Sequence, residues 1–164
     1  MTISINTKNT ILRTFLWFVL LIYLGILTKL IIFKRPLRYI KRYLLHQYSW
    51  ERAKANMHNA NLKPLTTIKL YLNSHGNAEY AINNLLGNII GFIPLGILLP
   101  LLFIRLRSAV TTIFCVFIFS LAFETFQLLS MLGIFDVDDL ILNTLGGAIG
   151  YLFFLLFANW IDRK

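Results

Sequence analysis

The apolar residues of this chain are grouped into four long runs separated by polar stretches, and this grouping limits the possible folds more than any other feature. A helix needs roughly 20 apolar residues to cross the hydrocarbon core of a bilayer. The chain is 57% hydrophobic, whereas soluble domains are roughly 45–50% apolar. We predict an all-α, polytopic membrane protein with about four transmembrane helices, near residues 11–33, 82–104, 109–132 and 139–161.

The first run is too long for a signal-peptide core and no small-residue cleavage site follows it, so we expect it to remain as the first helix. The stretch 34–80 is the only sizeable part predicted to lie outside the membrane. It begins KRPLRYIKRYLLHQYSWERAK, in which apolar residues recur at helical spacing and basic residues occupy the other faces, a pattern typical of an interfacial amphipathic helix. No internal repeat is visible, so residues 1–164 are predicted to form one domain.

The chain carries a formal net charge of +9, from 16 Lys and Arg against 7 Asp and Glu. Most basic residues lie just outside the apolar runs, where anionic headgroups attract each of them by about 1 kcal/mol. We therefore expect membrane lipids, with anionic lipids as candidates, and no nucleic acid as partners. The basic residues on the two sides nearly balance. We expect the N-terminus on the inside, whereas the dense basic run after the first helix favours the opposite orientation. No oligomeric state is predicted.

Glu124 is the most informative polar residue within an apolar run. An ionised side chain at the bilayer centre costs roughly 2.5–3.5 kcal/mol even on lenient insertion scales. Gln127 follows three residues later and Ser120 precedes by four, so the three side chains share one helix face. That face must point into the bundle or a polar cavity. We favour a functional role for Glu124; the alternative is a neutral carboxyl group bonded to Gln127 or to an asparagine.

Two other runs carry polar residues spaced four apart. These are Asn84 and Asn88 in the second run, and Asp139 and Asn143 in the fourth. Glycines accompany both pairs, at positions 87 and 91 and at positions 146, 147 and 150. Small residues allow membrane helices to approach closely, and amide side chains hydrogen-bond across the gap. We predict that the three helices converge here, and for the glycines alone close packing is the preferred interpretation.

Three of the seven acids stand where the fourth helix begins, at Asp136, Asp138 and Asp139. Acids at this position cap a helix and complement its dipole. Alternatively, their oxygens would suit a divalent cation, and both interpretations remain open. No cofactor is predicted otherwise. The three histidines lie in the long loop without ligand-like spacing, so we interpret them as surface residues.

Four blocks resemble, in order and spacing, the signature blocks of the VanZ-like family of bacterial membrane proteins. They are NLKPLTTI (61–68), NLLGNIIGFIPLGILLP (84–100), SLAFETFQ (120–127) and DVDDLILNTLGGAIGY (136–151). The chain departs from the family pattern at Leu65, where relatives usually have an aromatic residue. It also has Gly-Ile-Phe at 133–135, where an arginine often precedes the aspartates. Membership is therefore implied more firmly than a shared phenotype.

The resemblance implies a multi-pass protein of the bacterial plasma membrane that lowers susceptibility to teicoplanin or related lipoglycopeptides. Because no nucleophile–base pair is recognisable, we favour a non-enzymatic envelope protein that binds a lipid or a lipid-linked cell-wall intermediate. The alternatives are a metal-assisted enzyme acting on a lipid headgroup and a small proton-coupled carrier.

The candidate ligand-binding residues are Asn61, Pro64, Asn84, Asn88, Glu124, Gln127, Asp136, Asp138, Asp139 and Asn143. Catalytic residues are not assigned. With four spans, the loop segment Asn61–Pro64 lies on the same side of the membrane as the aspartate turn. We therefore expect this segment to close over the site.

Overall fold

The computed structural model describes residues 10–32, 40–41, 45, 48–73 and 78–162. Its main elements in these ranges are α1 (Thr10–Ile32), α3 (Trp50–Met57), α4 (Thr66–Leu72), α5 (Ala78–Leu102), the short 3-10 helix η1 (Ile104–Leu106), α6 (Ala109–Ser130) and α7 (Val137–Asp162). Within the described residues, α1, α5, α6 and α7 are long and apolar enough to cross a membrane. The predicted all-α class with four spans is confirmed.

The four spans begin and end within a few residues of the predicted limits. The largest difference is at α5, which starts at Ala78, because the polar residues before the apolar run continue the helix. The amphipathic helix expected at the start of the 34–80 stretch lies largely outside the described residues. Its last part overlaps α3, which begins at Trp50 with the hydroxyl of Ser49 accepting a hydrogen bond from the Arg52 amide at 3.2 Å.

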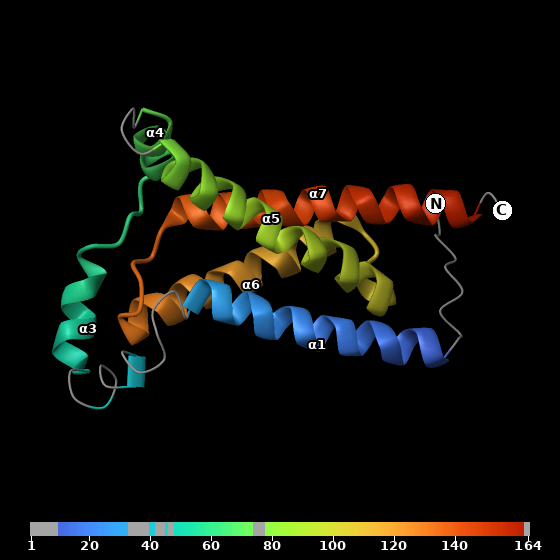
Figure 1. The fold of residues 1–164 in the computed structure, drawn as a ribbon, viewed down its shortest axis with the longest axis horizontal. Coiled ribbons are helices and arrows are strands. Elements are labelled where there is room, and N and C mark those ends of the chain that lie inside the picture. The colour runs from blue at the N-terminus through green and yellow to red at the C-terminus, as the bar shows by residue number, and fades with distance from the viewer. Residues whose placement is uncertain (1–9, 33–39, 42–44, 46–47, 74–77, 163–164) are drawn as a thin grey trace.

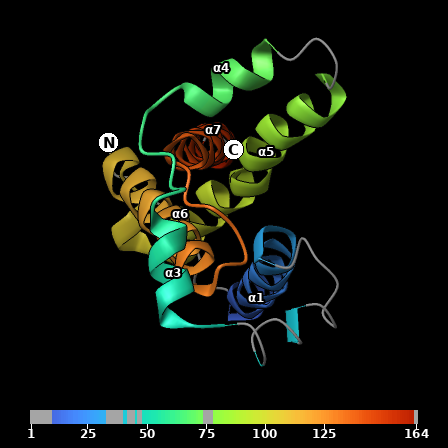
Figure 2. The same ribbon diagram turned by 90° about the vertical axis from the view of Figure 1, so that its left-hand side faces the viewer.

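The long helices run side by side, and α3 and α4 both lie at the end of the bundle where α7 begins, on different sides of it (Figure 1). The end-on view shows α7 close to α4, α5 and α6, with α1 standing to one side (Figure 2). The main packing is between α7 and both α5 and α6, and α1 packs chiefly on α5. The connection from α6 to α7 and the segment from α3 to α4 therefore meet at one end of the bundle.

Glycines bring α5 and α7 into backbone contact. A Cβ atom added to Gly146 would collide with the carbonyl of Ile89, and one added to Gly150 would collide with the carbonyl of Ile93. From the other helix, a Cβ on Gly96 would collide with the carbonyl of Gly147. Two helices can approach this closely only where the residue that faces the other backbone has no side chain. Close packing is thus confirmed for the glycines of α7, whereas the predicted pair on α5 does not meet α7: a Cβ on Gly87 meets nothing within 4 Å, and one on Gly91 meets only Leu27 of α1.

Helix α1 stands at the side of the bundle, and few of its side chains are buried. Leu20 and Leu27 pack into the core beside α5, whereas residues such as Phe15 and Phe18 remain exposed on the outer face. Tyr23 donates its hydroxyl proton to the carbonyl oxygen of Gly91 at 2.7 Å. The hydroxyls of Thr14 and Thr28 donate to carbonyls of their own helix, those of Thr10 and Leu24. Few contacts hold α1 in place.

Candidate functional site

The aspartate turn before α7 pairs directly with the loop that precedes α4. Asn61 and Asp136 form an isolated parallel bridge: the backbone N–H of Asn61 donates to the carbonyl of Phe135 at 2.8 Å, and the backbone carbonyl of Asn61 accepts from the Val137 amide at 3.0 Å. The side chains add to it: the Asn61 amide nitrogen and the Thr67 hydroxyl donate to the two carboxylate oxygens of Asp136, at 2.8 and 2.6 Å. We call this group, together with Asp138, the clamp.

Asp138 completes the clamp by capping a helix other than its own. Its fully buried carboxylate accepts hydrogen bonds from the backbone amides of Leu65, Thr67 and Ile68, at 2.5, 2.7 and 3.1 Å. The first amides of an α-helix lack partners within the helix. Leu65, at the N-cap of α4, has φ 66°, a left-handed conformation. Charged caps of this kind give strong, charge-assisted hydrogen bonds.

Three further side chains stabilise the same end of the bundle. Glu124, 2% exposed, accepts from the backbone amide of Asp136 at 3.1 Å. Gln127 donates to the carbonyl of Ile31, in the last turn of α1, at 2.9 Å. Asn56 of α3 donates to the carbonyls of Leu128 and Gly133, at 3.3 and 3.1 Å. Asn56 was not among the predicted residues, because a single asparagine in a short amphipathic segment has no distinctive spacing.

These contacts account for the aspartates of the clamp without a cation. Among the described residues, no group of three His, Cys, Asp or Glu side chains is arranged to hold a metal ion. Pro64 is exposed between Asn61 and α4. The loop and the turn are in contact, and the oxygens of Asp136 and Asp138 act as acceptors for N–H and O–H groups of the chain itself.

Asn143 lies deeper, between α6 and α7. Its amide nitrogen donates to the hydroxyl of Ser120 at 2.9 Å, and both side chains are buried. The Asn143 Oδ1 atom is buried and has no hydrogen-bond partner in the structure. A buried amide oxygen left without a partner carries a desolvation penalty of about 1–3 kcal/mol.

We expect the Ser120–Asn143 pair to be replaceable without loss of stability. Ser120→Ala alone leaves the whole amide unpaired and lowers the free energy of unfolding by about 1–2 kcal/mol. The double variant Ser120→Ala, Asn143→Leu removes both polar groups with little change in shape, and its stability should equal or exceed that of the wild type. Unfolding in detergent micelles measures both; a double variant less stable than Ser120→Ala would assign this pair a role that packing does not explain.

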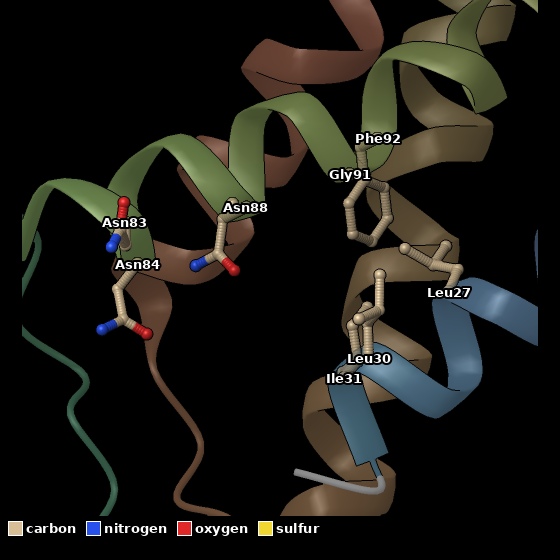
Figure 3. Close-up of a pocket in the computed structure, with 9 residues that line it drawn as sticks. Leu27, Leu30, Ile31, Asn83, Asn84, Asn88, Gly91 and Phe92 are labelled. Carbon is tan, nitrogen blue, oxygen red and sulfur yellow. The ribbon is translucent and has the colours of Figure 1, made fainter. Parts of the chain in front are cut away.

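The remaining predicted residues line a pocket between α5 and α1. It has a volume of about 200 Å³ and is lined by Leu27, Leu30 and Ile31 of α1 and by Asn83, Asn84, Gly87, Asn88, Gly91 and Phe92 of α5. Figure 3 shows Asn84 and Asn88 pointing from α5 into this space, with the leucines of α1 opposite. Asn88 donates to the carboxylate of Asp139 at 2.5 Å. The pocket is amide-lined at one end and apolar at the other.

The predicted site therefore divides into two parts. Asn61, Glu124, Asp136 and Asp138 belong to the clamp or its support, while Asn84 and Asn88, with Asp139 behind them, belong to the pocket. Asn83 also lines the pocket and was missed. It stands next to Asn84, outside the four-residue spacing that identified the other amides, although Gly87 and Gly91 continue its own stripe.

Fold and site together define a four-span polytopic membrane protein with a buried polar clamp at one end and an amphipathic pocket beside it. The sequence model of the VanZ/LLP1 family matches residues 15–158. The chain is 30% identical to Protein VanZ of Enterococcus faecium over 145 residues, which cover 88% of this chain and 76% of that protein. No solved structure matches the chain. The chain belongs to the VanZ/LLP1 family, and the predicted resemblance is confirmed.

Proposed function

We propose that this protein binds a chain of a membrane lipid or a lipid-linked cell-wall intermediate in the pocket between α1 and α5. Through this binding it alters the susceptibility of the bacterial envelope to antibiotics of the teicoplanin type. The plasma membrane is its place of action. The observation that carries the proposal is the change in the lining of the pocket along the direction of the membrane normal, from amide side chains at one end to apolar side chains at the other.

That polarity matches one leaflet of a bilayer. Asn84 lies near the start of the α5 span and Phe92 lies eight residues deeper, a distance of about 12 Å at 1.5 Å per residue. Half of a typical hydrocarbon core is about 15 Å. The amides are therefore at the depth of headgroups and upper chains, while Leu27 and Phe92 are at the depth of the acyl chain. A lipid would enter this pocket in its ordinary orientation.

The size of the pocket favours part of a lipid over a whole antibiotic. Sites for drug-sized molecules usually have volumes of roughly 300–1,000 Å³. At about 200 Å³, this pocket accommodates a segment of one chain with its first polar group. With the expected orientation, N-terminus inside, the pocket opens toward the outer leaflet, where lipid-linked cell-wall intermediates meet lipid-tailed antibiotics.

Filling the pocket tests the proposal. A Cβ on Gly87 meets nothing within 4 Å, and Gly87 lines the pocket, so Gly87→Leu occupies the space without disturbing the fold. Gly25→Leu on α1 is the matched control, because a Cβ there is also free of contacts. A Gram-positive host expressing each protein at equal membrane levels is assayed for teicoplanin susceptibility, and lipids that copurify with each protein are quantified.

We expect the wild type and Gly25→Leu to lower susceptibility and to retain bound lipid. Gly87→Leu should lose both, because its side chain fills the pocket. Equal protection by Gly87→Leu and Gly25→Leu would remove the pocket from the mechanism. If the wild type gives no protection but retains lipid that Gly87→Leu loses, the binding part stands and the antibiotic part fails.

A further inference from the structure

The pocket contains one polar group whose orientation is set by a neighbour. Asn88 donates its amide nitrogen to a carboxylate oxygen of Asp139, and an ionised carboxylate can only accept. Asp139 stands in the first turn of α7, where the positive end of the helix dipole favours a negative charge. The side-chain nitrogen of Asn88 must therefore face α7, and the side-chain oxygen of Asn88 must face away from α7.

The side-chain oxygen of Asn88 points toward the pocket. In Figure 3 the oxygen of Asn88 lies on the side of α1 and its nitrogen on the opposite side. The pocket wall thus presents a fixed hydrogen-bond acceptor, with the carboxylate of Asp139 behind it. The side-chain amide of Asn83 contains both a donor and an acceptor. No Lys, Arg or His is among the residues that the structure places around the pocket.

The inference drawn from these observations rests on the proposed lipid-binding function and concerns the hydrogen-bonding group of the lipid. We propose that the pocket selects lipids whose polar group donates a hydrogen bond, such as a free hydroxyl, over lipids that only accept. A phosphodiester oxygen placed against Asn88 would face an amide oxygen, which has no hydrogen to donate. Asp139 acts here as a positioning residue, through Asn88.

A matched pair of lipids tests this selection. 1,2-Dioleoylglycerol has one hydroxyl donor, and its 3-O-methyl ether has the same chains without that donor. We compare binding of the two to the full-length protein in nanodiscs by competition against a photoreactive diacylglycerol. For the wild type, one neutral hydrogen bond of about 1 kcal/mol corresponds to about fivefold tighter binding of the alcohol.

The variant Asp139→Asn releases the constraint, because an amide partner can accept or donate and Asn88 can then rotate. We expect the preference for the alcohol to fall to near one while both lipids still bind, a change that general destabilisation would not produce. Asn88→Leu should lose the preference as well.

The outcomes separate this inference from the proposed function. If the wild type binds both lipids equally, the selection is wrong and lipid binding stands. A preference that survives in both Asp139→Asn and Asn88→Leu also overturns the assignment to these residues. If neither lipid competes for the pocket of the wild type, while Gly87→Leu labels as strongly as the wild type, the proposed lipid site itself fails.

Discussion

Replacing Gly146 with alanine is expected to lower the free energy of unfolding by about 3 kcal/mol, since overpacking a tight contact usually costs about 1–3 kcal/mol and occasionally more. The added methyl group would overlap the backbone carbonyl of Ile89. A flexible side chain could rotate away, but a carbonyl within a helix cannot, so α5 and α7 must separate. Titration of the micelle-solubilised protein with a denaturing detergent, followed by circular dichroism, measures the loss.

Gly25→Ala is the control for this prediction. It makes the same chemical change within a membrane helix, at a position where the new methyl group meets nothing within 4 Å. Both variants gain the same intrinsic helix propensity, so the difference between them isolates the collision. If Gly146→Ala is as stable as Gly25→Ala, the close crossing of α5 and α7 is not how the bundle packs.

The second large effect is expected at Asp138. Asp138→Ala leaves three backbone amides at the start of α4 without their acceptor and should destabilise the clamp by about 3 kcal/mol, because unsatisfied buried donors cost about 1–3 kcal/mol each. Hydrogen exchange measures this directly: the amides of Leu65, Thr67 and Ile68 should exchange much faster. Asp138→Asn, which keeps one acceptor oxygen, should give an intermediate effect.

An exposed acid on the same side of the bundle provides the comparison. Glu51 lies in the first turn of α3 and is exposed, so Glu51→Ala removes the same charge without removing a buried acceptor. It should leave the exchange of the α4 amides unchanged. Unaltered exchange in Asp138→Ala would show that water replaces the carboxylate and that the cap contributes little.

Much of the fold follows from the sequence because the membrane imposes simple rules. Apolar length predicted the four spans, and the glycine stripe of the fourth run predicted the face of α7 that meets α5. The corresponding stripe on α5 lies toward α1 instead. The burial of Glu124 followed from the energy of placing a carboxylate in lipid. These are local patterns on single helices, and each can be identified without knowing the partner.

The division of the polar residues into clamp and pocket could not be predicted in the same way. Asp138 and Asp139 are adjacent, with equal propensities for capping, yet one caps α4 and the other orients Asn88 of α5. On a helix, neighbouring residues point about 100° apart, so their partners depend on which elements stand on each side. That arrangement is a tertiary property, as is the capping of α1 by Gln127.

The contrast between α1 and α6 has a consequence for biosynthesis. Leaving the translocon, α1 is suited to remain alone in the bilayer, because the hydroxyls of Thr14 and Thr28 bond their own helix and the side chain of Tyr23 donates a single hydrogen bond to α5. Helix α6 is less suited to remain alone, because three of its polar side chains bond to residues outside it. Ser120 bonds Asn143 of α7, Glu124 bonds the amide of Asp136, and Gln127 bonds the carbonyl of Ile31 in α1. We therefore expect α6 to partition stably into the bilayer only when α7 is beside it.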